Sequence, residues 1–102
     1  MSGEAFSLIY ADQVKGHLRA IDRQFYSLIR RTIEAELRYQ PDVETRNRKP
    51  MRPNPLAPWE LRIGELRVYY EIEEDPGWVV TIVAVGVKDR NRVLIGGKEF
   101  EL

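Results

Sequence analysis

Residues 59–73 constrain the fold more than any other part of the chain, because apolar and polar side chains alternate there around a turn signal. Two alternating runs flank Gly64-Glu65, and glycine in the first central position suits a two-residue type II′ hairpin turn. Such a turn fixes the register of the two strands. The expected pairs are Ile63 with Leu66, Arg62 with Arg67, Leu61 with Val68, Glu60 with Tyr69 and Trp59 with Tyr70.

The two faces of this hairpin differ in polarity. One face is apolar and predicts a core surface; its residues are Trp59, Leu61, Ile63, Leu66, Val68, Tyr70 and Ile72. The other face carries the polar side chains of the hairpin, which are Glu60, Arg62, Arg67, Tyr69 and Glu71. A hairpin of this kind predicts an antiparallel sheet with one face against the core and the other toward water.

Residues 14–37 carry apolar side chains at three- and four-residue steps, which is the pattern of an amphipathic helix. The apolar residues are Val14, Leu18, Ile21, Phe25, Leu28, Ile29, Ile33 and Leu37, and the opposite positions hold Lys15, Arg19, Arg23, Arg30, Arg31 and Arg38. One long helix fits this pattern, and so does a helical hairpin broken near residues 20–22, since Asp22 suits the cap of a second helix. The helix is expected to end before Pro41.

Three more strands are expected outside the hairpin. Residues 6–10 form a short apolar run, and residues 78–88 are almost continuously apolar, which favours a central strand. A four-residue loop over 74–77 would place Ala84 opposite Arg67, so that Ala84, Gly86 and Lys88 share the polar face. After a turn over 88–92, residues 93–95 and 98–102 predict a last small hairpin around Gly96-Gly97.

Residues 41–58 separate the helical part from the sheet and show no periodicity. They hold five of the six prolines, together with Arg46, Arg48, Lys49 and Arg52. Eighteen residues without regular structure are unusual in a small domain, and such loops tend to be functional or disordered. A solvated linker stiffened by proline is the alternative.

Composition excludes several classes of protein. The 102 residues suffice for one domain over 1–102, and 43% hydrophobic residues allow a continuous core. Without cysteine and with one histidine, His17, the chain has no disulfide, thiolate metal site, cysteine nucleophile or histidine-cluster metal site. No apolar run approaches the roughly 20 residues of a membrane helix, and the first residues lack a signal-peptide pattern. We expect a soluble, cytoplasmic protein without a membrane partner.

The formal net charge of zero conceals an uneven distribution. Sixteen basic residues balance sixteen acidic ones, but residues 15–67 contain twelve basic and seven acidic residues, a surplus of five positive charges. A polyanion responds to such a local surplus more than to the total charge. The neutral total therefore does not exclude a nucleic-acid partner.

The pairing of Arg62 with Arg67 is unfavourable for folding alone, because like charges in opposite positions repel. At ~5 Å the repulsion is about 1 kcal/mol in water. One interpretation is a charged ladder on a solvated face, with Glu60 and Glu71 offsetting the repulsion. The other is an anion site formed by Arg62, Arg67 and Lys88 with basic residues of the loop, since arginine forks suit phosphate oxygens. Tyr69 would offer a ring on which a base could stack.

The order of these parts resembles the RelE/ParE superfamily of toxins from type II toxin-antitoxin modules. The similarity extends over most of the chain, from Phe6 to about Lys88. Its most specific parts are Lys49-Pro50-Met51-Arg52, similar to a Lys-Pro-Leu-Lys/Arg segment of the family, and residues 59–72, similar to its Trp-x-x-Arg-x-Gly-x-x-Arg-hydrophobic-x-Tyr pattern. Val85-Gly86-Val87-Lys88 is similar to the family's closing strand.

The resemblance implies an α+β fold in which a helical hairpin packs on a small twisted antiparallel sheet. It implies a toxin that inhibits translation as a ribosome-dependent endoribonuclease, cutting messenger RNA without a metal or other cofactor. The partners would be a cognate antitoxin, the ribosome and messenger RNA. Some members of the superfamily instead poison DNA gyrase, and a non-catalytic relative that only binds an antitoxin is a further alternative.

The resemblance also implies roles for individual residues. The catalytic candidates are Lys49, Arg52, Glu60, Arg62, Arg67 and Lys88, and the RNA-binding candidates are Arg46, Arg48, Tyr69 and Arg90. Ribonuclease members often carry a tyrosine or histidine near the C-terminus as proton donor or stacking group, where this chain has Leu94 and Ile95. Glu60 replaces a lysine of some members; it would act as a general base or neutralise Arg62.

Overall fold

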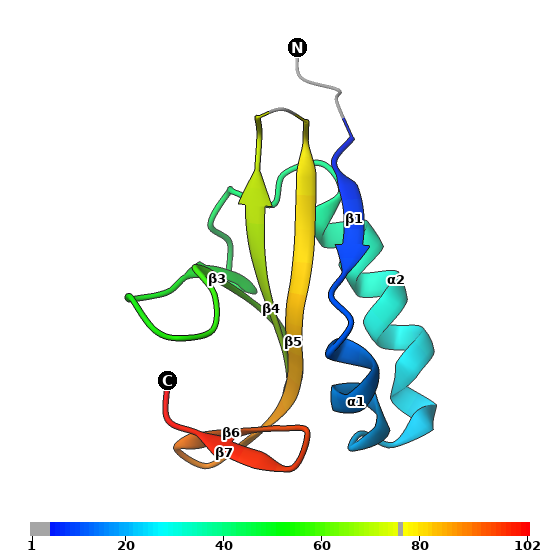
Figure 1. The fold of residues 1–102 in the computed structure, drawn as a ribbon, viewed down its shortest axis with the longest axis vertical. Helices are drawn as coiled ribbons and strands as arrows, with labels where there is room; N and C mark the ends of the chain where they lie inside the picture. Colours follow the sequence, from blue (N-terminus) through cyan, green and yellow to red (C-terminus); the bar gives the residue numbers. More distant parts are fainter. Residues whose placement is uncertain (1–4, 76) are drawn as a thin grey trace.

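A computed structural model describes residues 5–75 and 77–102, and a seven-stranded sheet is its largest element (Figure 1). The strands are β1 (Ser7–Tyr10), β2 (Arg48–Pro50), β3 (Trp59–Ile63), β4 (Leu66–Glu73), β5 (Val79–Asp89), β6 (Arg92–Ile95) and β7 (Lys98–Phe100). The helices are α1 (Val14–Arg19) and α2 (Tyr26–Leu37), with a 3-10 turn over Arg23–Phe25 between them. Residues 1–4, where no signal peptide is expected, and Pro76, within the predicted turn, lie outside the described residues.

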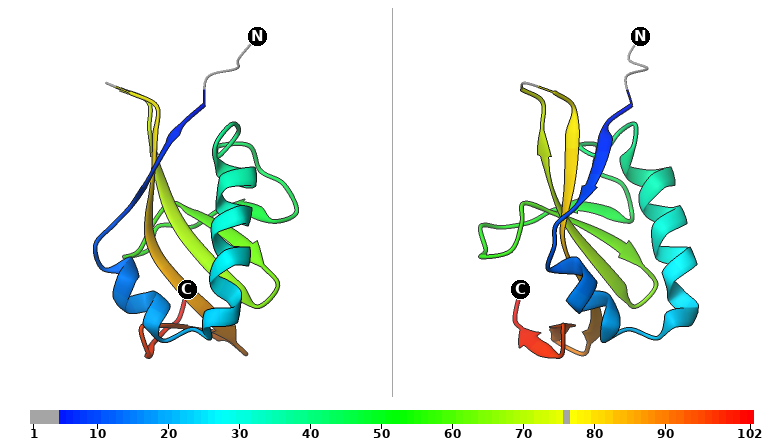
Figure 2. Two further views of the ribbon diagram at one scale, coloured as in Figure 1. Left: turned by 90° about the vertical axis from the view of Figure 1, so that its right-hand side faces the viewer. Right: turned by 45° about the vertical axis from the view of Figure 1, so that its right-hand side comes forward.

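The strands follow the order β2-β3-β4-β5-β6-β7, with each pair antiparallel. The first strand, β1, pairs in parallel with the beginning of β5 (Figure 1). The central strand β5 therefore has β4 and β1 as neighbours in its first half and β4 and β6 at its end, which confirms its predicted central position. Helix α2 lies along one face of the sheet (Figure 2).

The predicted fold class, a helical hairpin on a small sheet, is wrong. The sheet has seven strands, whereas α1 has only six residues and α2 twelve. The helical periodicity of residues 14–37 is interrupted because the Asp22 side chain accepts a hydrogen bond from the backbone N–H of Gln24 and begins the 3-10 turn. In addition, Arg48–Pro50, predicted as loop, pairs with β3 and lengthens the sheet.

The main core lies between the helices and the apolar face of the sheet. It buries Ile29, Ile33 and Leu37 of α2 against Leu61, Val68, Tyr70, Val80, Ile82 and Val85. Trp59, Ile63 and Ile72 pack on the edge of this cluster, so all seven residues predicted for the apolar face contribute to it. Each Å² of this apolar face that is removed from water stabilises the fold by about 25 cal/mol.

The hairpin of β3 and β4 has the predicted register. Arg62 lies opposite Arg67, and the other four predicted pairs also occur. A type II′ turn requires a positive φ at its first central residue and a negative φ at its second. Gly64 has a φ of +60°, and Glu65 does not have a positive φ, so both requirements are met. The turn residue and the alternation together determine this part of the structure.

The register between β4 and β5 differs from the prediction by two residues. Arg67 lies opposite Gly86 rather than Ala84. One residue of the difference arises because Glu73 pairs with Val79, so the connection is longer than four residues, and the other arises from a β-bulge at Val83. A shift of two residues preserves the face, because side chains alternate with a period of two.

Helix α1 completes the hydrogen bonding of this bulge. The Gln13 amide nitrogen donates to the carbonyl oxygen of Val83 at 3.1 Å, and the backbone N–H of Val85 donates to Nδ1 of His17 at 3.4 Å. Buried backbone groups that leave a ladder need such partners. The bond to Val85 requires Nδ1 of His17 to be unprotonated, and partial burial lowers the pKa of His17 below 6.5.

We expect this contact to make stability depend on pH. Because the folded pKa of His17 is lowered, the folded chain binds fewer protons there than the unfolded chain, and stability falls as the pH drops below about 6.5. Thermal melts should show a larger loss of Tm between pH 7.5 and pH 5.5 in the native chain than in His17→Gln, which keeps an acceptor but does not titrate. Equal losses would contradict this role.

The opposite face of the sheet carries a second, smaller core. Tyr69 and Ala84 are buried there under Ala57, Val93 and Ile95. Asn54 holds the covering loop in place: its side-chain oxygen accepts from the backbone N–H groups of Leu56 and Ala57, and its nitrogen donates to two carbonyls. The expectation of a solvated face is therefore wrong at its centre, and the second half of the proline-rich segment is a folded cover.

Within residues 5–75 and 77–102, neither helix is long and apolar enough to cross a membrane.

Candidate functional site

A pocket of about 160 Å³ lies where β3, β4, β5 and the start of β6 meet. Four of the predicted catalytic residues line it, namely Glu60, Arg62, Arg67 and Lys88, and the other lining residues are Asn91, Arg92, Val93 and Leu102. The β3–β4 register and the alternation of side chains direct the first three residues to this face. The structure thus brings together residues that are up to 28 positions apart in sequence.

Glu60 lies between the two arginines and offsets their repulsion. Its Oε1 is 2.8 Å from Nε of Arg62, and its Oε2 is 4.0 Å from Nε of Arg67. Glu60 and Arg67 are each only 8% exposed, whereas the Arg62 side chain is 47% exposed. The site is therefore a buried carboxylate with one buried and one accessible guanidinium.

Backbone carbonyl groups of the hairpin turn hold the Arg67 guanidinium in position. Its Nη1 donates to the carbonyl oxygens of Gly64 at 2.7 Å and Leu66 at 2.9 Å, both at the hairpin turn. These bonds fix the guanidinium before any ligand arrives, and a preorganised charge costs no reorganisation on binding. The type II′ turn thus positions a side chain of the site as well as the strands.

The charges of the pocket favour an anion. Arg62, Arg67, Lys88 and Arg92 line it, against one acidic side chain, Glu60. Arg92 is also paired with Glu99, with 2.7 Å between Nη1 and Oε2. Several guanidinium groups around a small cavity are typical of sites for phosphate groups.

Arg92 and Asn91 line the pocket but were not predicted from the sequence as site residues. The segment containing them was predicted as a turn, and the pairing of Asp89 with Arg92 across that turn brings both residues to the pocket. The Lys-Asp-Arg-Asn-Arg sequence could have predicted this placement, because a two-residue turn at residues 90–91 makes Arg92 the strand partner of Asp89.

Arg48, predicted to bind RNA, has a structural role instead. It is 8% exposed, and its guanidinium donates to the carbonyl oxygens of Val43 and Glu36 and to the Glu36 carboxylate at 2.9 Å. Its position opposite Leu61 in the β2–β3 pair turns it toward the core. The sequence did not predict this placement, because a basic residue in a loop-like sequence gave no sign that the segment is a strand.

The other basic residues of residues 41–58 lie outside the pocket. Lys49 pairs with Glu60 across β2 and β3, and its Nζ is 3.6 Å from Oε2 of Glu44. Arg52 is exposed and lines a separate hollow formed by residues of the 51–58 segment, and Arg46 is also exposed. Lys49 is thus adjacent to the site, whereas Arg46 and Arg52 are not brought to it.

Tyr69 does not offer a ring for stacking, because its side chain is fully buried in the second core. Leu94 and Ile95 have no titratable proton; Leu94 pairs with Val87 and Ile95 is buried. Within the described part of the chain, no group of three or more His, Asp or Glu side chains could hold a metal ion.

Arg90 is exposed at the β5–β6 turn with a φ of +60°, a conformation that costs L-residues roughly 1 kcal/mol. We expect Arg90→Gly to relieve this strain and raise Tm by roughly 4–8 °C in a domain of this size. Arg90→Lys keeps both charge and strain and should leave Tm unchanged. Thermal unfolding followed by circular dichroism measures the difference, and a lower Tm in Arg90→Gly would contradict the expectation.

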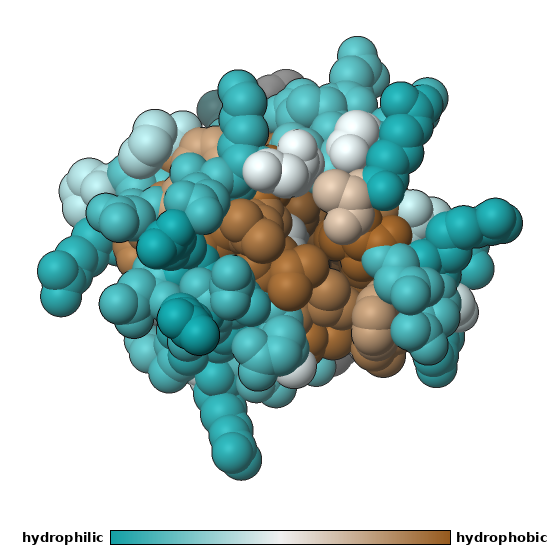
Figure 3. Space-filling model, turned by 90° about the horizontal axis from the view of Figure 1, so that it is seen from below, coloured by the Kyte–Doolittle hydropathy of each residue, from teal (hydrophilic) through white to brown (hydrophobic). Residues whose placement is uncertain are grey.

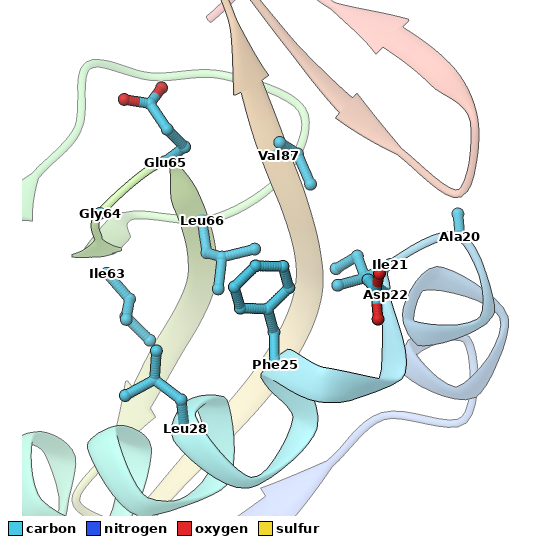
Figure 4. A pocket seen from close by; sticks show the side chains of 10 residues that line it. All are labelled: Ala20, Ile21, Asp22, Phe25, Leu28, Ile63, Gly64, Glu65, Leu66 and Val87. Carbon is cyan, nitrogen blue, oxygen red and sulfur yellow. The ribbon is translucent and has the colours of Figure 1, made fainter.

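An apolar groove of about 430 Å³ lies at the end of the molecule where α2 begins. Figure 3 shows apolar surface gathered at the centre of this end, surrounded by hydrophilic side chains. Figure 4 shows Phe25 pointing toward Leu66 and Leu28 toward Ile63, while the carboxylate of Glu65 points away. Phe25 and Leu28 are 38% and 39% exposed, so the groove is open to a partner.

A scan against models of known protein families finds no match to this chain, and a search of curated proteins finds no significantly similar sequence.

Proposed function

We propose that this chain is the toxin of a type II toxin-antitoxin module and acts as a ribosome-dependent messenger RNA endoribonuclease. The observation that carries the proposal is the pocket in which Glu60 lies between Arg62 and Arg67, with Lys88 on the same wall. The resemblance of residues 49–52 and 59–72 to the RelE/ParE superfamily supports it. The pocket combines a base with cations, which RNA cleavage through the 2′-hydroxyl requires.

The proposed reaction uses side chains of this pocket together with solvent. The ribose 2′-oxygen attacks the adjacent phosphorus and passes its proton to the Glu60 carboxylate, forming the O2′–P bond. The bond from phosphorus to the 5′-oxygen breaks, and that oxygen takes a proton from solvent. Arg67 and Arg62 bind the phosphate oxygens and stabilise the charge that develops on them, with Lys88 adding a third positive charge.

The shape of the pocket is the reason for proposing dependence on the ribosome. At about 160 Å³ it accommodates a phosphate group, and among the described residues that line it there is no aromatic ring on which a base could stack. The pocket therefore binds the reacting phosphate but makes no stacking contact with the bases of the RNA. A ribosome that fixes the message in an extended form would supply the orientation that proximity catalysis needs.

We also propose that a cognate antitoxin binds this protein in the cytoplasm. The groove formed by Phe25, Leu28, Ile63 and Leu66 has the open apolar character that suits one face of an amphipathic segment. Co-expression with the protein encoded by the neighbouring reading frame should yield a complex on affinity purification and should prevent growth arrest.

The decisive experiment is inducible expression in bacteria with three readouts: growth, incorporation of labelled amino acids, and mapping of message ends by primer extension. We expect growth arrest, a fall in translation and new 5′ ends within translated regions. Purified protein should cut a message on purified ribosomes and leave the same message intact without them, in the presence of a chelator. Continuing translation and intact messages in the induced cells would contradict the proposal.

The same experiment identifies the two alternatives. Induction of the DNA-damage response with continuing translation would replace the proposal with a gyrase-directed toxin. Normal growth at high expression would replace it with a non-catalytic, antitoxin-binding relative.

A further inference from the structure

Tyr69 has a polar group that the fold does not use. Its side chain is fully buried, and among residues 5–75 and 77–102 its hydroxyl is the buried side-chain polar atom without a hydrogen-bond partner. Leaving a buried hydroxyl unsatisfied lowers the stability of the folded state. Unsatisfied groups of this kind are rare in folded proteins and call for an explanation.

Packing does not explain the hydroxyl. The ring packs against Ala57, Ala84, Val93 and Ile95, and none of these contacts needs a hydroxyl on the ring. Phenylalanine would fill the same space without the penalty. The neighbouring Tyr70 shows the ordinary situation, because its hydroxyl donates to the carbonyl oxygen of Pro41 at 2.7 Å.

The candidate partner of the hydroxyl is Glu60. The two residues lie opposite each other in the β3–β4 pair, and opposite side chains share a face with Cβ atoms about 5 Å apart. Burial and the nearby Glu60 carboxylate raise the pKa of Tyr69, so the phenol keeps its proton and is able to donate it in a hydrogen bond.

Glu60 has other partners in the free protein, and these are the groups that an anion would attract. Its carboxylate is paired with Arg62 at 2.8 Å and approached by Arg67 at 4.0 Å. A phosphate in the pocket competes for both guanidinium groups. Glu60 is 8% exposed, so losing them would leave a carboxylate that is buried and poorly paired, which is costly.

We propose that Tyr69 is a positioning residue whose hydroxyl donates a hydrogen bond to Glu60 when a phosphate group engages Arg62 and Arg67. This inference rests on the proposed anion site and deepens it. In the free protein the hydroxyl lies beside the Glu60 carboxylate without a hydrogen bond of regular geometry, and in the complex it makes that bond. It keeps Glu60 charged and oriented, as a base facing the ribose 2′-hydroxyl must be.

The test follows the hydroxyl directly by NMR of protein labelled with 13C at tyrosine Cζ, titrated with inorganic phosphate. Signals from the arginine Nε–H groups report binding at Arg62 and Arg67. We expect the Tyr69 Cζ signal to move together with the arginine signals, while the Tyr70 signal, whose hydroxyl is already bonded, stays in place.

The matched variants are Tyr69→Phe and Tyr70→Phe. We expect Tyr69→Phe to retain or raise Tm, because it removes an unsatisfied group, and to bind phosphate about tenfold more weakly. Tyr70→Phe removes a satisfied buried bond and should lower Tm while leaving phosphate affinity unchanged. Tyr69→Phe that loses as much stability as Tyr70→Phe would overturn the inference.

The outcomes distinguish the inference from the proposed function. If phosphate leaves the arginine signals unchanged, the anion site is wrong and the inference falls with it. If the arginine signals move while the Tyr69 signal and the affinity of Tyr69→Phe do not change, the inference alone is overturned and the proposed function stands.

Discussion

Replacing Arg67 with alanine is expected to reduce cleavage of translated messages by about 100-fold or more and to abolish growth arrest. The guanidinium is buried and fixed by two carbonyl oxygens of the hairpin turn, so it is oriented toward the phosphate before binding. Loss of one preorganised donor to a developing negative charge typically costs 10²–10³ in rate. Primer extension on messages from induced cells, together with cleavage on purified ribosomes, measures the effect.

Several variants separate catalysis from folding in this experiment. Arg67→Ala frees the carbonyls of Gly64 and Leu66 and should lower stability, so its Tm is measured in parallel. Arg62→Ala removes a half-exposed side chain and one partner of the buried Glu60 carboxylate, so its Tm is measured as well, and it should lose activity. Arg46→Ala, an exposed residue outside the pocket, should retain both activity and stability. Full activity in a folded Arg67→Ala protein would contradict the assignment.

Replacing Gly86 with alanine is expected to produce the largest loss of stability among conservative substitutions. A Cβ at this position would meet the backbone oxygen of Leu94 at 2.5 Å and the side chains of Ile95 and Val93 at 2.7 and 2.9 Å. The carbonyl cannot rotate away as a side chain would, so β6 has to move off β5. The cost of such overpacking is about 2–3 kcal/mol, which corresponds to a fall in Tm of roughly 10–20 °C.

The matched control is Gly16→Ala. Gly16 lies in α1 with no atom within 4 Å of an added Cβ, and alanine favours a helix, so Tm should stay the same or rise. Because Gly86 lies opposite Arg67 and β6 carries Arg92, displacement of β6 should also weaken phosphate binding. If the Tm of Gly86→Ala equals that of the native chain, β6 can move away from β5 without loss of stability, and the expectation is wrong.

The β3–β4 hairpin is the part of the fold that the sequence predicted in detail. Its register, its apolar face and its turn type follow from local rules, because glycine in the first central position and a period of two leave one arrangement. The last small hairpin and the central position of β5 follow from turn signals and an apolar run. The grouping of Glu60, Arg62 and Arg67 was predictable for the same local reason.

Other features were not predictable, because they depend on contacts between distant segments. The strand at Arg48–Pro50 exists because β3 offers an edge to pair with, and its own sequence is loop-like. The bulge at Val83 is stabilised by Gln13 and His17, some seventy residues earlier. These pairings turned the expected helical hairpin on a small sheet into a seven-stranded sheet with short helices.

The sequence by itself determined which residues share the polar face of the hairpin, since alternation and turn chemistry act between near neighbours. Only the tertiary structure decided how far each of them is exposed. The 51–58 segment and β6–β7 cover Tyr69. Glu60 and Arg67 are buried, while Arg62 stays accessible. How deeply a side chain is buried depends on segments that are distant in the sequence, and a local pattern holds no information about them. Because of this burial, the charged residues of the hairpin form a pocket in which Glu60 and Arg67 are buried and Arg62 is accessible.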